Sequence, residues 1–200
     1  MAANTTTTIK LNTGAQMPLL GLGTWKSPHE EVRAAVISAI EAGYRHLDCA
    51  SAYGNEKSVG EGLADVIARG IVTREQVFVT TKLWVTDTDD VAAALTKSLE
   101  ALGLSYVDLY LIHWPFALTK GSAFPPPLEN RLGYDPARYA RVWAEMETEA
   151  TNGRARAIGV SNFSCKKVAE LLKTAMIVPA VNQVGWRWGL LMDELSTPCA

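Results

Sequence analysis

Short apolar runs alternate with segments of helical periodicity along most of the chain, and this alternation constrains the fold more than any other feature. The helical stripes are Val32, Ala35, Val36, Ala39 and Ile40; Val59, Leu63, Val66 and Ile67; Ala92, Leu95, Leu99 and Leu102; Tyr139, Val142 and Met146; and Val168, Leu171, Leu172 and Met176. The runs between them, such as 77–84 and 106–114, are typical of buried strands. Because crossover helices return the chain to the same end of a sheet, the sequence predicts a parallel sheet of about six βα units.

Two segments interrupt the alternation. Residues 7–22 hold two short apolar segments around Asn-Thr-Gly-Ala-Gln, which indicates a β-hairpin. Residues 114–136 form a long connection rich in proline and glycine. Connections of that length inside a domain are usually functional or disordered. We therefore expect the second segment to border a functional site.

Two architectures are compatible with alternating strands and helices. An open, doubly wound sheet usually carries Gly-x-Gly-x-x-Gly after its first strand, but residues 21–26 have the first two glycines and no third. Such a pair by itself is equally consistent with a tight turn. A (β/α)8 barrel instead places its catalytic groups at the carboxyl ends of successive strands. That expectation can be checked directly against the sequence.

Composition excludes several classes of function. The 200 residues are 48% hydrophobic and carry a formal net charge of −2, which suits one globular domain spanning 1–200 and gives no basic surface for nucleic acid. The opening segment has no secretory pattern, and no apolar run approaches the roughly 18 residues of a membrane span, so a cytoplasmic location is expected. Cys49, Cys165 and Cys199 lack Cys-x-x-Cys spacing and suggest no metal site.

Polar residues stand at the ends of three consecutive predicted strands. Asp48 ends the second strand, Lys82 the third and His113 the fourth, and Tyr53 follows Asp48 in a glycine-containing turn. Taken singly, a strand-end Asp is most often a turn residue, a Lys a solvated charge and a His a structural residue. In a barrel, however, all four would converge on one mouth.

These four residue types suit reduction of a carbonyl group. A ketone or aldehyde accepts hydride only if its oxygen is protonated or strongly hydrogen-bonded as negative charge develops. Tyr53 can supply that proton, and a neighbouring Lys82 ammonium is expected to lower the tyrosine pKa. Asp48 would keep the lysine charged, and His113 would orient the carbonyl. A Schiff base on Lys82 is the weaker alternative, because a nearby acid favours the charged amine.

The motifs around these residues closely resemble those of the aldo-keto reductases, in the same order and spacing. They are G-L-G-T-W, G-Y-R-H-L-D-C-A-S-A-Y-G-N-E, T-T-K-L-W, D-L-Y-L-I-H-W-P and A-I-G-V-S-N-F, within residues 8–184. The resemblance implies a (β/α)8 TIM barrel with an N-terminal hairpin and an NADPH-dependent reductase of aldehydes and ketones. It also implies that Asp48, Tyr53, Lys82 and His113 are the catalytic tetrad, with Tyr53 as general acid.

The resemblance extends to binding residues. It implies that Ser161, Asn162 and Gln183 hydrogen-bond the nicotinamide carboxamide, and that Thr24 and Asp48 also lie at the cofactor. Trp25, Trp84 and Trp114, with His113, correspond to the lining of the family's substrate pocket, although any one tryptophan could be core filler. The family's members are expected to be monomers that act on small carbonyl compounds.

The resemblance ends after about residue 184, where a divergent tail, 185–200, replaces the family pattern. Only about six βα units are present, so the barrel is expected to be incomplete, with two unpaired edges through which copies could associate. In the family, the last two strands bind the cofactor's phosphates. A second hypothesis therefore stands beside the reductase: a catalytically inactive truncated or splice-type fragment, or a binding or regulatory protein on the same scaffold.

Overall fold

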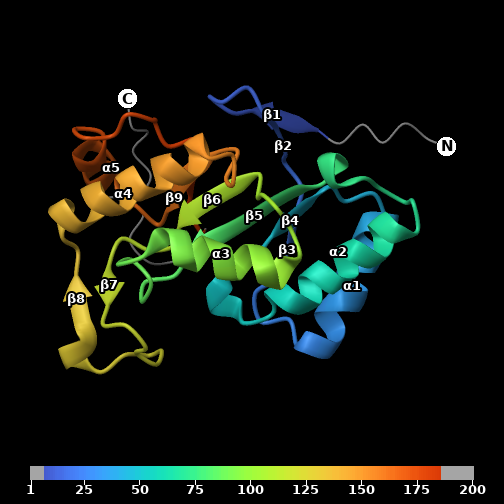
Figure 1. Ribbon diagram of the computed structural model, residues 1–200, viewed down its shortest axis with the longest axis horizontal. Coiled ribbons are helices and arrows are strands. Elements are labelled where there is room, and N and C mark those ends of the chain that lie inside the picture. Colours follow the sequence, from blue (N-terminus) through green and yellow to red (C-terminus); the bar gives the residue numbers. More distant parts are fainter. Residues whose placement is uncertain (1–6, 186–200) are drawn as a thin grey trace.

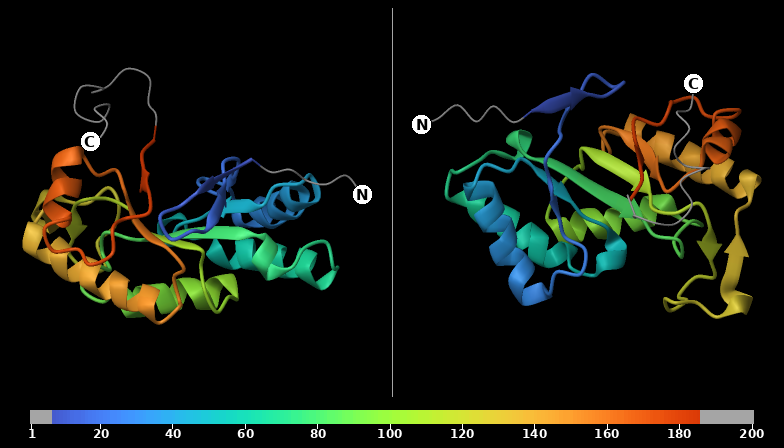
Figure 2. Two further views of the ribbon diagram at one scale, coloured as in Figure 1. Left: turned by 90° about the horizontal axis from the view of Figure 1, so that it is seen from above. Right: turned by 180° about the vertical axis from the view of Figure 1, so that it is seen from behind.

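A computed structural model describes residues 7–185 and shows a six-stranded parallel sheet in the order β10-β9-β6-β5-β4-β3. Its strands are β3 (Leu22–Gly23), β4 (His46–Asp48), β5 (Phe78–Leu83), β6 (Leu109–Ile112), β9 (Ile158–Ser161) and β10 (Asn182–Gln183). The sheet curls into an open half-barrel, with helices along its convex side (Figures 1 and 2). The predicted parallel sheet of six strands is therefore confirmed.

The helices alternate with these strands as the periodicity predicts. They are α1 (His29–Glu41), α2 (Glu56–Ala68), α3 (Val91–Leu102), α4 (Pro136–Thr151) and α5 (Cys165–Leu171), with short 3-10 turns η1 (Ser51–Tyr53), η2 (Arg74–Gln76) and η3 (Leu128–Asn130). Local sequence sets several boundaries. Asp90 caps α3 by accepting the Ala93 N–H at 2.9 Å, and Gly103 ends that helix in the left-handed conformation.

The two faces of the sheet have separate apolar cores. The larger core lies between the sheet and the helices, and includes Val79, Tyr110 and Ile158. Side chains alternate between faces along a strand, so Phe78, Thr80 and Lys82 share the opposite, concave face of β5. This alternation places Lys82 inside the half-barrel, at the carboxyl end of its strand.

The concave face is closed at the amino ends of its strands by a hairpin. Strands β1 (Thr8–Lys10) and β2 (Gln16–Pro18) pair antiparallel, as the sequence predicts. Leu11, at the end of β1, packs with Phe78, Leu109, Leu111 and Ala157 in the smaller core. The hairpin therefore seals the bottom of the half-barrel and leaves the carboxyl ends for the site.

The two-glycine segment is not the tight turn that its spacing allowed. Leu22–Gly23 forms the edge strand β3. A Cβ atom on Gly21 would lie 2.9 Å from the ring of His46, so glycine is required there by close approach of the neighbouring strand. The absence of a third glycine is thus consistent with the barrel architecture.

Residues 114–136 form an arm in which β7 (Ala117–Leu118) pairs antiparallel with β8 (Arg131–Gly133) and which projects from the body (Figure 1). The predicted end of the last helix needs correction. The last helix stops at Leu171 and leaves Met176 88% exposed, rather than part of an apolar stripe. The Glu147 carboxylate accepts the backbone N–H groups of Met176 and Ile177 at 2.7 and 2.8 Å, which draws that segment away from helical pairing.

No helix within residues 7–185 combines the length and the apolar character needed to cross a bilayer. The predicted divergent tail lies outside the described residues, apart from Gly185.

Candidate active site

Three of the four predicted catalytic side chains form a continuous polar cluster on the concave face. The Lys82 ammonium is 2% exposed and donates to Asp48 Oδ1 at 2.6 Å and to the Cys49 carbonyl oxygen at 2.8 Å. It also donates to the Tyr53 hydroxyl at 3.5 Å. A buried ammonium keeps its proton only when it is paired, so Asp48 supplies the charge that makes this arrangement stable.

The environment of Tyr53 differs from the sequence expectation in one respect. Lys82 does lower the pKa of the half-buried Tyr53 hydroxyl, as predicted, but burial has the larger effect and the net pKa is raised above 10.0. The expected net decrease is therefore wrong. Tyr53 is consequently protonated near neutral pH, which is the form that a general acid requires.

His113 lies beside Tyr53 and between two tryptophans. The Tyr53 and His113 ring centroids are 5.7 Å apart, and those of Trp84 and His113 are 5.1 Å apart, both edge to face. Trp114 stacks on His113 at 6.4 Å between centroids. Burial, with the nearby Lys82 charge, lowers the pKa of His113 to about 4. The imidazole is thus neutral and retains one N–H donor.

The predicted cofactor residues on β9 and β10 form a second polar group at the same end of the sheet. Asn162 has a left-handed backbone (φ 62°), and its Nδ2 donates to the His113 carbonyl oxygen at 2.9 Å and to Ser161 Oγ at 3.0 Å. Gln183 Nε2 donates to Asp48 Oδ2 at 3.0 Å. The Gln183 Oε1 atom is buried and has no hydrogen-bond partner among the described residues. Both oxygens of Asp48 are therefore held, one by Lys82 and one by Gln183.

Thr24 and Trp25 differ in their relation to the cluster. Thr24 is fully buried, and its N–H and Oγ1 both donate to the Asp48 carbonyl oxygen, at 3.1 and 3.2 Å. Trp25 is 60% exposed and stacks under the Lys26 ammonium. Within residues 7–185 it makes none of the ring contacts that join Trp84 and Trp114 to His113. The structure thus brings Thr24 against Asp48 and leaves Trp25 exposed.

Two residues directly after the Tyr53 turn were missed by sequence reasoning. Asn55 is buried and donates to the carbonyl oxygens of Thr24 and Ser27 at 2.9 and 3.0 Å. Glu56 is 6% exposed and accepts from Thr81 Oγ1 at 2.5 Å. These contacts tie the segment that follows Tyr53 to the loop after β3 and to strand β5. The available signal was a pair of polar residues, Asn-Glu, that opens a helix immediately after the turn.

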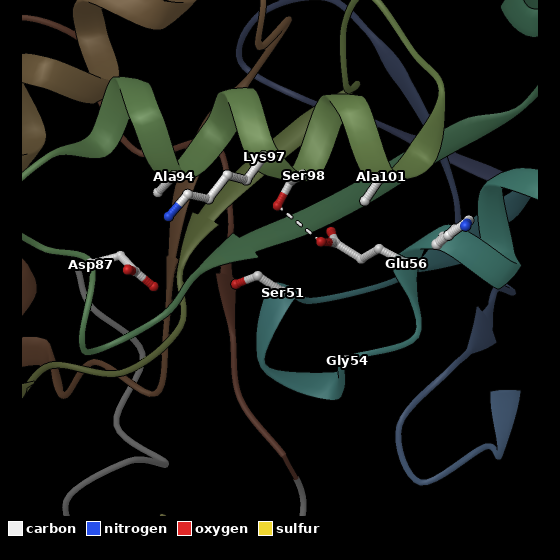
Figure 3. A pocket seen from close by; sticks show the side chains of 9 residues that line it. Ser51, Gly54, Glu56, Asp87, Ala94, Lys97, Ser98 and Ala101 are labelled. Carbon is white, nitrogen blue, oxygen red and sulfur yellow. Dashed lines mark hydrogen bonds between the residues drawn. The ribbon is translucent and has the colours of Figure 1, made fainter. Parts of the chain in front are cut away.

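A cavity of about 290 Å³ lies beneath the Tyr53 turn on the convex side of the sheet. Its lining includes Ser51 and Gly54 of the turn, Glu56 at the start of α2 and Ser98 of α3. Figure 3 shows the Glu56 carboxylate and the Ser98 hydroxyl facing each other, and they are hydrogen-bonded at 3.0 Å. Burial raises the pKa of Glu56. The cavity is separate from the tetrad, because Lys82 points to the opposite face of β5.

The half-barrel with a Lys–Asp–Tyr–His cluster at its carboxyl ends defines the class of protein. A family model described as "Aldo/keto reductase family" matches residues 19–190, and the chain belongs to this family. The resemblance predicted from the sequence motifs is therefore confirmed. Among curated relatives, aldo-keto reductase family 1 member A1 of Mus musculus is 44% identical over 199 residues, which is 98% of this chain and 61% of that protein. Aldo-keto reductase family 4 member C11 of Arabidopsis thaliana is 49% identical over 177 residues, which is 88% of this chain and 55% of that protein.

Solved structures agree with the fold. The aldo-keto reductase of Bombyx mori in complex with NADP has a TM-score of 0.80 and 42% identity, over 90% of this chain and 58% of that one. The aldose reductase of Schistosoma japonicum has a TM-score of 0.83 and 41% identity, over 90% and 61%. The incomplete aldo-keto reductase barrel is thereby confirmed. This chain spans about 60% of the length of the relatives that it matches.

Proposed function

We propose that this chain is an NADPH-dependent reductase of aldehydes and ketones, in which Tyr53 is the general acid. The observation that supports this most is a protonated Tyr53 whose hydroxyl accepts from the Lys82 ammonium at 3.5 Å and whose ring centroid lies 5.7 Å from that of the neutral His113. A proton donor and a neutral N–H donor side by side suit a carbonyl oxygen that gains negative charge. NADPH would supply the hydride when it is bound.

Each residue of the tetrad has a separate role in this mechanism. Tyr53 gives its proton to the carbonyl oxygen, and the Lys82 ammonium stabilises the phenolate that is left. Asp48 keeps Lys82 charged through the 2.6 Å ion pair. His113 donates its N–H to the same carbonyl oxygen and orients the substrate. Trp84 and Trp114, which flank His113, give the substrate an apolar wall and limit access of water.

The residues present fit the nicotinamide end of the cofactor. The buried, unpartnered Gln183 Oε1 is an acceptor for a carboxamide N–H, and Ser161 and Asn162 add polar groups beside it. We infer that these three residues hold the carboxamide and that Thr24 and Asp48 border the ring. The substrate is a small carbonyl compound, with sugars among the candidate classes, and Trp25 lies at the pocket rim. We place the protein in the cytoplasm as a monomer, with association open to it through β3 and β10, the sheet edges.

The test begins with binding and proceeds to turnover. NADPH fluorescence is titrated with the 200-residue chain, with circular dichroism on the same sample to show that it is folded, and aldehyde-dependent loss of NADPH absorbance follows. Saturable binding with turnover supports the reductase. A folded chain that neither binds nor turns over NADPH would instead support the second candidate, an inactive fragment or binding protein on the same scaffold.

A further inference from the structure

The Gln183 side-chain amide has one satisfied end and one open end. Its Nε2 donates to Asp48 Oδ2 at 3.0 Å, while its Oε1 is buried without a partner among the described residues. A primary amide carries an acceptor at one end and donors at the other. The end that faces Asp48 therefore decides which kind of group is offered on the opposite side.

The surroundings of Asp48 allow only one of the two amide orientations. An ionised carboxylate only accepts hydrogen bonds, and Lys82 already holds Oδ1 at 2.6 Å. Turning the Gln183 amide over would place Oε1 against Asp48 Oδ2, oxygen against oxygen, in a site with little water to screen the repulsion. The carboxylate thus fixes Nε2 toward Asp48.

The Gln183 backbone cannot move away to relieve such a contact. Its carbonyl oxygen accepts from Ser161 Oγ at 2.7 Å and from the Asn162 N–H at 3.0 Å. The side chain also spans the concave face, because β10 is an edge strand and Asp48 lies on β4, four strands away in the sheet order. Gln183 is thus held both at its backbone carbonyl group and at its side-chain amide.

We propose that Asp48, besides pairing with Lys82, is the positioning residue that orients the Gln183 amide, so that this chain offers an acceptor and selects a ring substituent with an N–H donor. The proposal rests on the proposed function, because the ligand it concerns is the carboxamide of a nicotinamide cofactor. A 3-acetylpyridine ring, which has the carbonyl but no N–H, is expected to be rejected. A hydrogen bond to a carboxylate also polarises the amide and strengthens its oxygen as an acceptor.

The orientation is tested first in the cofactor-free chain by ¹H–¹⁵N NMR of side-chain amides. The sequence has three glutamines, and within residues 7–185 the hydrogen bonds of the other two side chains are to their oxygens: Gln16 accepts from Thr8 Oγ1 and Gln76 from the Thr73 N–H. A Gln183→Leu variant identifies the Gln183 signal. We expect Gln183 amide protons to exchange about tenfold more slowly than the other two, and Asp48→Asn to shift the signal. Exchange as fast as in Gln16 and Gln76 would overturn the proposal, even if Asp48→Asn does not fold.

Donor selection is tested by equilibrium binding of NADP⁺ and of its 3-acetylpyridine analogue. The intact chain is expected to prefer NADP⁺ by about tenfold, the scale of one hydrogen bond to a polarised group. The Asp48→Asn variant can present an amide nitrogen to Gln183, which lets the Gln183 amide turn over, so the preference should vanish or reverse. Equal binding of the two dinucleotides by the intact chain would refute donor selection. If neither binds while the Gln183 amide is protected, the proposed function fails and the orientation stands.

Discussion

An acid, at least one cation and a tyrosine lie together at each end of the parallel sheet, but the two clusters leave different groups available. At the amino end, Asp108 accepts from Arg74 Nη2 at 2.8 Å and from the Val79 N–H at 2.9 Å, and Arg156 lies 3.6 Å away. The two guanidinium groups also lie over the Tyr106 ring, at 4.1 and 3.7 Å from its centroid. At the carboxyl end, an acid, a cation and a tyrosine again meet, in Asp48, Lys82 and Tyr53.

The difference lies in what each cluster leaves available. The amino-end cluster ties β5, β6 and the start of β9 together, next to the smaller apolar core and the hairpin that covers it. The carboxyl-end cluster retains a protonated Tyr53, a neutral His113 and a Gln183 oxygen without a partner among the described residues. Similar charged residues therefore stabilise the amino end of this sheet, whereas at the carboxyl end they leave polar groups available to a ligand.

The largest expected effect is a loss of turnover on substitution at the carboxyl end of the sheet. Under the proposed function, Tyr53→Phe should lower carbonyl turnover by roughly 10²- to 10⁴-fold, because the general acid is removed while the ring is kept. NADPH oxidation by the two proteins measures this. Tyr106→Phe is the matched control, since it also removes a single tyrosine hydroxyl, one that lies at the opposite end of the sheet. Turnover by Tyr53→Phe within a few-fold of the parent chain would show that another group gives the proton.

The second prediction concerns the amino end. Asp108→Ala leaves the Arg74 charge and the Val79 N–H unpaired in a site where Asp108 is 8% exposed. We expect the free energy of unfolding to fall by roughly 3 to 5 kcal/mol, as measured by urea denaturation. Asp65→Ala, which removes only surface ion pairs with Arg33 and Arg69, should have little effect. Similar losses in both variants would mean that the Asp108 cluster is not the stabilising element.

The third prediction uses pH. The pKa of His113 is lowered from 6.5 to about 4, so the folded chain takes up this proton less readily than the unfolded chain. The resulting stability is fully present above about pH 6.5 and is lost as pH falls toward 4, amounting to roughly 3 kcal/mol. Denaturation curves at several pH values should show that the free energy of unfolding of His113→Gln falls less steeply with decreasing pH than that of the parent chain. His46, at the amino end of β4, also has a lowered pKa and accounts for part of what remains.

A substitution at the exposed His29 provides the reference for that measurement. His29→Gln should reproduce the pH dependence of the parent chain, because the residue lies at the solvent-exposed start of α1. A decline that is equally steep in His113→Gln and in the parent would show that the burial of His113 does not control acid stability.

The smallest expected effect lies at the hairpin. Asn12 Nδ2 donates to the Val178 carbonyl oxygen at 3.0 Å and joins the hairpin to the segment before β10. Because this contact is exposed, Asn12→Ala should cost about 1 kcal/mol or less in thermal denaturation. Asn130→Ala, in the projecting arm, is the control. A larger loss at Asn12 would make the hairpin a principal support of the open half-barrel.

Sequence periodicity was sufficient for the order of the elements and failed where side chains from elsewhere intervene. The stripes of α1 to α4 and the strand ends at Asp48 and Lys82 were predicted correctly except at Ala92, because local spacing alone sets which face a residue takes. Ala92 is exposed, and its neighbour Val91 is buried instead. The end of α5 was not, since Glu147 of another helix accepts the N–H groups that would have continued it. Asn55 and Glu56 were visible in the sequence, but their partners on other elements were not.

The sequence by itself therefore determined the family, the parallel sheet and the candidate residues at its carboxyl ends. Only the tertiary structure decided how those residues act on one another. The Gln183–Asp48 hydrogen bond joins positions 135 residues apart, and it exists because the sheet curls until an edge strand faces β4. The raised pKa of Tyr53 likewise follows from burial outweighing a nearby cation. Burial depends on everything that packs around a group, and no local pattern contains that information.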